Sequence, residues 1–315
     1  MRKLLKPLAL LLVVLGLFAF QDSYMIISYA EETNNIVNGK CGENVYWELN
    51  RNTGVLRIYG TGEMNDYRYK YDLLGKETVI ETEAPWLEQG YTEEITKVVI
   101  EKGVTYIGSS SFSSKRYVKA NVCVNLKTVE IADTVTEIGS NAFYNCTSLK
   151  SVTIQDNKPS CVKKIGRQAF MFCRELTDIS IFDSVTEIGS ESFHQCEKLD
   201  TVTIPEGVTS VADGMFSYCY SLHTVTLPDS VTAIEARAFT GTALTQIHIP
   251  AKVTRIGTDA FSECFALSTI TSDSESYPAI DNVLYEKSAN GDYALIRYPS
   301  RRADPALSLI HISEP

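Results

Sequence analysis

The sequence has few of the residues, and none of the motifs, from which enzymes usually build a catalytic centre. Only 4 of its 315 residues are histidine, and it contains no metal-ligand spacing, no P-loop and no Gly-x-Ser-x-Gly motif. Basic residues are also scarce, with 29 Lys and Arg against 39 Asp and Glu, so the net charge is −10. Nucleic acids need basic contact patches. We therefore expect a protein that is not an enzyme, uses no cofactor or metal, and binds no nucleic acid.

Long apolar stretches are missing after the first 30 residues. In the first 30 residues, three basic residues precede an apolar run of 13 residues, 8–20, and the small residues Ser28 and Ala30 follow that run. This run is shorter than the ~20 residues that cross a bilayer, which favours a cleaved signal peptide over a permanent anchor. No cysteine near Ala30 offers a thiol for a lipid. We predict a signal peptide at 1–30, a secreted or cell-surface location, and no membrane span after cleavage.

What the sequence does contain is a repeat marked by phenylalanine. From Phe170 to Phe261 the spacings are 23, 23, 23 and 22 residues. Such a fixed period is typical of stacked supersecondary units. The predicted structural core contains Phe143, Phe170, Phe193, Phe216, Phe239 and Phe261, and Phe112 marks the first unit. Stacking would bury these rings between neighbouring units, because one unit alone cannot cover its apolar face.

Each unit opens with a leucine, or with Ile95 in the first unit, and continues with Val or Ile three residues later and Ile or Leu five residues later. This period of two with β-branched residues predicts a short strand. Pro205, Pro228 and Pro250 end three of these strands, since proline cannot donate to a ladder. Ser, Asp or Thr stands three residues before five of the seven phenylalanines. These residues are typical helix N-caps, so we expect a short helical turn there.

The fold class is therefore a repeat solenoid, β-rich with short helical turns. We place the solenoid, of about eight rungs, at residues 94–273 and a small N-terminal β cap at 31–93. A β-hairpin insert at 274–302 is predicted by Asn290-Gly291 between two apolar stretches. Residues 303–315 abandon the repeat and resemble translated adapter sequence, so we expect a non-native tail.

Two features leave alternatives open. Tyr67, Tyr69 and Tyr71 alternate with basic residues; we favour a place in the cap over an aromatic binding patch. Insertions at 113–125 and 157–161 interrupt the array, and we favour tolerated surface loops over specificity elements.

Five of the eight cysteines occupy one repeat position: Cys146, Cys173, Cys196, Cys219 and Cys264. We expect them to stack as buried thiols, because parallel side-chain vectors are poor disulfide geometry. One disulfide among Cys41, Cys123 and Cys161 stays an option. His194 and Cys196 share a turn, but a place in the thiol ladder is a better account of Cys196 than nucleophilic catalysis.

The outward strand positions form the candidate binding face: Thr201, Thr203, Thr224, Thr226, Gln246 and His248. Rows of threonine are also typical of ice-binding solenoids, but Gln246 and His248 interrupt the rows and β-propensity explains threonine there. One acidic residue per turn, as at Asp229, is too few for calcium.

Two repeat phrases, Leu199-x-x-Val202-x-Ile204-Pro205 and Ala142-Phe143-x-x-Cys146, resemble the BspA-like leucine-rich-repeat family of bacterial surface proteins. The Gly60-Thr61-Gly62 turn and Ala84-Pro85-Trp86 resemble its N-terminal region, and the resemblance covers about residues 36–300. The chain departs from the pattern at Thr242, where the repeat cysteine is missing.

The resemblance implies a surface or secreted protein used for adhesion or protein binding, with a host or bacterial protein or a glycan as partner. The alternative is a targeting or display module of a larger exported enzyme. A third class is structural surface-layer material.

Overall fold

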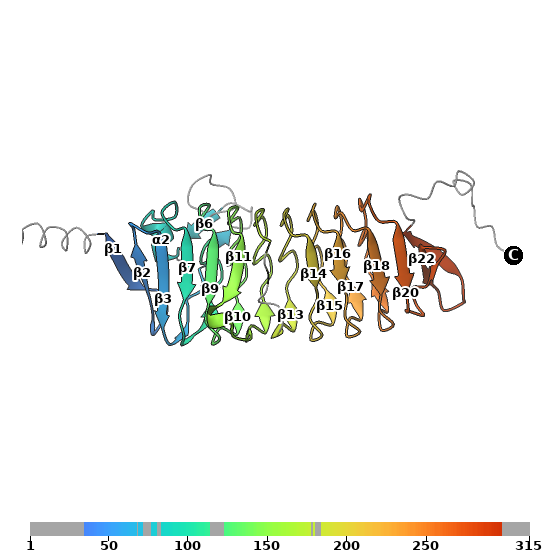
Figure 1. Ribbon diagram of the computed structural model, residues 1–315, viewed down its shortest axis with the longest axis horizontal. Coiled ribbons are helices and arrows are strands. Elements are labelled where there is room, and N and C mark those ends of the chain that lie inside the picture. Colours follow the sequence, from blue (N-terminus) through green and yellow to red (C-terminus); the bar gives the residue numbers. More distant parts are fainter. Residues whose placement is uncertain are drawn as a thin grey trace, which may run out of the picture.

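The computed structural model describes residues 35–67, 69–71, 77–80, 83–113, 123–177, 179 and 184–297. The repeats follow one another as a row of rungs along one long axis (Figure 1). Strands of successive rungs pair in parallel and without slippage, so that Val129 lies between Val98 and Val152. Part of the strand predicted near residue 181 lies outside the described residues.

Most rungs contribute one longer and one shorter strand. The longer strands are β7 (Lys97–Ile100), β9 (Thr128–Ile131), β11 (Ser151–Ile154), β14 (Thr201–Thr203), β16 (Thr224–Thr226), β18 (Gln246–Ile249) and β20 (Thr269–Ser272). The shorter strands are β8 (Val104–Ile107), β10 (Glu137–Ile138), β12 (Lys164–Ile165), β13 (Glu187–Ile188), β15 (Ser210–Val211), β17 (Ala233–Ile234) and β19 (Arg255–Ile256). Alternate side chains of the longer strands point inward, which explains the period of two in the sequence.

The phenylalanine rings form one continuous column in the interior. From Phe112 to Phe261, neighbouring ring centroids lie 5.0 to 5.9 Å apart and the ring planes differ by at most 14°. All seven rings are at most 3% exposed. Each ring between the two ends of the column is therefore covered by its two neighbours, and the buried surface exists only because the rungs are stacked.

The corners before each phenylalanine are turns, and the expectation of a helical turn there is wrong. The residue two positions before the ring adopts a left-handed conformation, with φ of 55° at Asn141, 56° at Glu191 and 55° at Arg237. The amide of Asn141 donates to the carbonyl of Arg167 in the next rung (2.9 Å), and that of Phe143 to Ala169 (2.8 Å). The neighbouring rung thus supplies acceptors for the amides that would lack a partner in the first turn of a helix, so no N-cap is needed.

Antiparallel strands extend the sheet at its N-terminal side. β1 (Ile36–Lys40), β2 (Val45–Asn50) and β3 (Val55–Gly60) form a meander, and β3 pairs in parallel with β7. All three strands lie within the segment 31–93, for which the sequence predicts a small β cap. The single short α-helix among the described residues, α2 (Pro85–Glu88), carries Trp86, whose ring stacks on Phe112 at 5.3 Å. The column of rings therefore begins in this region.

Tyr67 belongs to the same N-terminal core. It is 3% exposed, and its ring meets Trp86 edge-on at 6.2 Å. β4 (Gly62–Glu63) adds to the short-strand row beside β8, and the backbones of β5 (Tyr69–Tyr71) and β6 (Glu77–Ile80) pair with each other. The side chains of Tyr69 and Tyr71 lie outside the described set, so the aromatic-patch alternative stays open for them.

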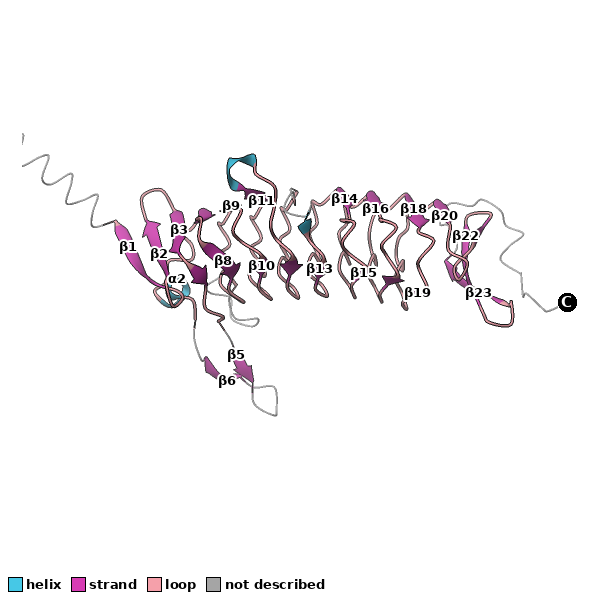
Figure 2. Cartoon of the chain, turned by 90° about the horizontal axis from the view of Figure 1, so that it is seen from below, coloured by secondary structure: helices cyan, strands magenta, loops and turns pink. Residues whose placement is uncertain are grey.

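The last described segment is a three-stranded antiparallel sheet of β21 (Ala279–Ile280), β22 (Val283–Lys287) and β23 (Tyr293–Arg297). The hairpin predicted at Asn290-Gly291 joins β22 to β23 and is confirmed. The insertion after β11 starts with a short 3-10 turn, η1 (Gln155–Asn157), and projects as a loop beside β11 (Figure 2). Of the 113–125 insertion, only residues 113 and 123–125 are described.

The eight cysteines all lie in the described part of the chain and are free thiols. Seven are buried and Cys161 is exposed. In the ladder, each thiol donates to the phenylalanine carbonyl of the rung before, as from Cys219 to Phe193 (3.1 Å) and from Cys196 to Phe170 (3.3 Å). The ladder cysteine is thus both a small apolar side chain and a hydrogen-bond donor.

Candidate functional site

The predicted binding face lies on three neighbouring longer strands, β14, β16 and β18, and β20 follows them along the array (Figure 1). Register places Thr201 beside Thr224 and Thr203 beside Thr226, and further along the array Gln246 beside Thr269 and His248 beside Thr271. All six predicted residues project from the outer side; Thr224 is half-buried and the other five are exposed. Together with Thr269 and Thr271 of β20, the six residues form two rows, Thr-Thr-Gln-Thr and Thr-Thr-His-Thr.

The imidazole groups on this face are fixed by neighbouring side chains. His248 Nδ1 lies 2.9 Å from Thr271 Oγ1, and its Nε2 lies 3.4 Å from Asp273 Oδ2. His223 Nδ1 lies 2.9 Å from Asp200 Oδ1. With strands about 4.8 Å apart, four strands offer a flat polar strip roughly 14 Å wide. Such a strip presents hydroxyl, amide and imidazole groups to a large flat partner.

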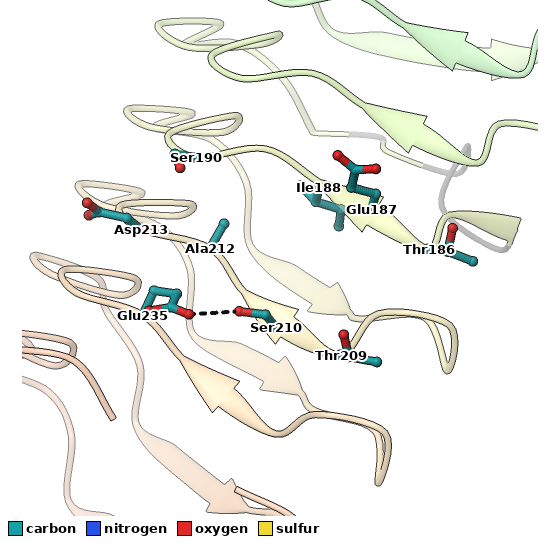
Figure 3. Close-up of a pocket in the computed structure, with 9 residues that line it drawn as sticks. All are labelled: Thr186, Glu187, Ile188, Ser190, Thr209, Ser210, Ala212, Asp213 and Glu235. Carbon is teal, nitrogen blue, oxygen red and sulfur yellow. Dashed lines mark hydrogen bonds between the residues drawn. The ribbon is translucent and has the colours of Figure 1, made fainter. Parts of the chain in front are cut away.

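A second, hollowed area lies on the short-strand row, around β13, β15 and β17. This pocket has a volume of about 390 Å³ and is lined by hydroxyl, carboxyl and small apolar groups (Figure 3). Its carboxylates already have partners: Asp213 accepts two bonds from Arg237 (3.0 and 3.1 Å), and Glu235 pairs with Arg255 and accepts from Ser210 (3.2 Å). The local acidity is thus largely neutralised within the array.

A third area was missed at the sequence level: an aromatic edge formed by Tyr144, Phe172, His194, Tyr218 and Tyr220. Neighbouring rings contact each other at centroid distances of 5.4, 5.5, 5.6 and 6.0 Å, the first three edge to face. The first four stand alternately one and two positions after the repeat phenylalanine. The signal was present in the sequence, but only the left-handed turn shows that these two positions share one edge.

His194 and Cys196 each have another hydrogen-bond partner. His194 Nδ1 lies 2.5 Å from Ser217 Oγ, whereas the Cys196 thiol donates to the Phe170 carbonyl. Burial raises the pKa of Cys196 well above its usual value, so the thiol stays protonated. Burial also lowers the pKa of His194 below its usual value.

Two further structural observations concern metals and membranes. Across the described ranges, no three His, Cys, Asp or Glu side chains are grouped so as to hold a metal ion. Within the same ranges, no helix combines the length and the apolar character needed to cross a bilayer.

Stacked rungs with inward Leu, Val, Ile and Phe and an outward polar strand face define a leucine-rich-repeat protein. The family model described as "BspA type Leucine rich repeat region (6 copies)" matches residues 90–160, 115–239 and 163–290. The chain belongs to this family.

Solved structures include a similar protein, a leucine rich cell surface protein from Faecalibacterium prausnitzii. It is 63% identical, with a TM-score of 0.64, over 85% of this chain and 63% of that one. The chain thus spans less than two thirds of that protein's length. Two further leucine-rich-repeat proteins, from Eubacterium ventriosum and T. pallidum, are 26% and 24% identical with TM-scores of 0.41 and 0.43. They cover 76% and 72% of this chain, and the chain covers 73% and 90% of theirs. None of the curated proteins compared with the chain matches it.

Proposed function

We propose that this chain is an exported leucine-rich-repeat solenoid that mediates adhesion or protein binding at or beyond the cell surface. The observation that carries the proposal is the polar strip on β14, β16, β18 and β20. The inward side chains of these strands are buried in the core, whereas the outward rows are accessible to a partner. The cell-surface description of the 63% identical protein and the apolar run at 8–20 support export.

The partner in this proposal is a protein of a host or bacterial surface, or a glycan. Neutral hydroxyl and amide groups dominate the strip, which suits a hydrogen-bonding partner rather than a highly charged one. The N-terminal strands β1 to β3 act as the cap that covers the first rung, since Trp47, Trp86 and Phe112 form one buried cluster there.

The test uses the purified chain immobilised on a sensor surface and probed with panels of extracellular proteins and of glycans. The double variant Thr203→Lys/Thr226→Lys places two charges on the strip. Thr186→Lys/Thr209→Lys on the short-strand row is the matched control. The proposal requires a ligand whose binding is lost in the first variant and retained in the second. If every ligand found bound both variants equally well, the strip would not be the contact face.

A second candidate is a targeting or display module within a larger exported enzyme. The observation that favours it is that the chain spans 63% of the length of its Faecalibacterium relative. Sequencing the complete gene separates the two, because a hydrolase, protease or transglutaminase domain on the same reading frame would support the second candidate.

A further inference from the structure

The aromatic edge is interrupted at one rung, where the repeat is a residue shorter. Leu222 follows Phe216 by six positions, but Leu244 follows Phe239 by only five. Both rungs keep the same turn up to the ladder position, since Cys219 donates its amide to Phe216 (3.1 Å) and Thr242 donates to Phe239 (3.2 Å). The turn that Tyr220 and Ser221 form after it has no counterpart in the next rung. The shortened rung therefore has one residue fewer at this edge than the rungs on either side of it.

The edge residues of the shortened rung are small, and exposed aromatic residues occupy the equivalent position in the rungs on either side. Ala243 stands at the position that Tyr220 holds one rung earlier and Phe265 one rung later. Tyr220 is 57% exposed and Phe265 is 75% exposed, whereas the rings of the interior column are at most 3% exposed. The Tyr218 ring lies over Gly241, because a Cβ added there would be only 2.5 Å from Tyr218 Cδ1. We call Tyr218, Tyr220, Gly241, Ala243 and Phe265 the aromatic notch.

The charge around the notch indicates the sign of its occupant. Glu263, two residues before Phe265, is exposed, and no ion pair is found for its carboxylate within the described part of the chain; the nearby Arg297 guanidinium donates instead to the Cys264 carbonyl (2.8 Å). In the neighbouring rungs of the edge, by contrast, Glu197 is already paired with Arg174 (3.4 Å). The chain as a whole carries −10. A partner with a cationic side chain beside an apolar segment is therefore complementary in charge.

The spacing of the flanking rings indicates the backbone form of the occupant. Tyr220 and Phe265 are two rungs apart, roughly 9.6 Å at the strand spacing of about 4.8 Å. A polyproline II helix advances about 3.1 Å per residue with three residues per turn, roughly 9.3 Å per turn. Proline-rich segments dock in grooves lined by aromatic side chains. Their carbonyls have no internal partners, so the hydroxyls of Tyr218 and Tyr220 have acceptors to bond.

We propose that the aromatic notch binds a proline-rich peptide segment in the polyproline II form, with an arginine or lysine of that segment paired to Glu263. This inference rests on the proposed binding role of the array and adds a site separate from the polar strip. One turn of the peptide lies along the long axis between Tyr220 and Phe265, and the Tyr218 ring supports it from below.

The experiment measures fluorescence anisotropy of a labelled peptide of eight prolines followed by two arginines. The matched probe replaces the prolines with alternating glycine and serine and keeps the arginines. We expect the purified chain to bind the proline peptide at least about tenfold more tightly than the matched probe. Tyr220→Ala/Phe265→Ala should remove that preference, and Glu263→Gln should weaken binding and reduce its salt dependence. Thr147→Ala, at the same repeat position in an earlier rung, is the control that keeps full affinity.

Three results would overturn the inference. They are equal affinity for the two peptides, unchanged affinity in the double variant, and binding of a neutral oligosaccharide such as cellohexaose at the notch in place of the peptide. Thermal melting checks that the exposed variants stay folded. Thr203→Lys/Thr226→Lys separates the two proposals, because it should abolish ligand binding at the polar strip and leave proline-peptide binding intact.

Discussion

Removing one ring from the middle of the phenylalanine column tests whether stacking holds the array together. Phe193 is fully buried, and its ring lies 5.4 Å from Phe170 and 5.6 Å from Phe216. Burial of such a side chain is worth about 1.5–3 kcal/mol, and each stacked pair adds about 0.5–1.5 kcal/mol. We therefore expect Phe193→Ala to lower the free energy of unfolding by about 3–5 kcal/mol, as large-to-small core changes do.

The position of the damage is as informative as its size. Because each rung contacts only its neighbours, amide hydrogen exchange should accelerate first between about residues 166 and 222, while β2 and β3 keep their protection. Urea unfolding gives the free energy and exchange mass spectrometry gives the location. Tyr220→Ala removes an aromatic ring from the exposed edge and should cost only about 0.5 kcal/mol. A Phe193→Ala cost below about 1 kcal/mol, or protection lost evenly over the whole array, would refute the stacked account.

Three further predictions concern thiols, pH and the shortened rung. In native protein at pH 8, a thiol reagent should modify only the exposed Cys161 rapidly, because burial raises the pKa of buried thiols such as Cys123 and Cys219 to about 12. All eight thiols should react in denaturant. Fast labelling that persists in Cys161→Ser would contradict this prediction. Burial and, to a lesser extent, Arg237 lower the pKa of His194, and Glu191 opposes them. Below about pH 6.5 the unfolded chain therefore binds more protons than the folded chain. The free energy of unfolding should decrease as the pH is lowered through that range. The melting temperature of His194→Gln should vary less than that of wild type between pH 7.5 and 5. Identical pH profiles for the two proteins would exclude His194 as the cause. Gly241→Ala should cost about 1–3 kcal/mol more than Gly90→Ala, since both glycines have positive φ but only the first would meet a ring; equal urea midpoints for the two would show that Tyr218 moves aside.

The stacking of the rungs and the identity of the core residues could be predicted from the sequence. A spacing of 23 residues with Val, Ile and Phe at fixed positions leaves few arrangements in which every copy buries the same side chains, so Phe170 must lie over Phe193. The ladder of free thiols followed from the same argument, because Cys196 and Cys219 occupy equivalent positions. The hairpin at Asn290-Gly291 was equally local, since its turn chemistry is contained in two residues.

The backbone conformation of the turns before each phenylalanine could not be predicted from the local sequence. Serine three residues before Phe143 is a good N-cap, and propensity alone favours a helical turn there. The neighbouring rung overrides that preference, because its carbonyls accept the amides of Asn141 and Phe143 and hold Asn141 at a φ of 55°. The aromatic edge was missed for the same reason.

The candidate sites, too, were predicted from the sequence in part and depended on the tertiary structure for the rest. Alternation along the strands placed Thr203, Thr226 and His248 on the outside, because a period of two fixes which side chains leave the core. The shortened rung between Tyr220 and Phe265 is also visible in the sequence, but only the folded chain shows that the Tyr218 ring covers Gly241. The sequence period determines which side chains are buried, because equivalent positions in successive repeats face the same side of the array. The shape of an edge depends on which turns of neighbouring rungs meet, and those contacts join residues more than twenty positions apart.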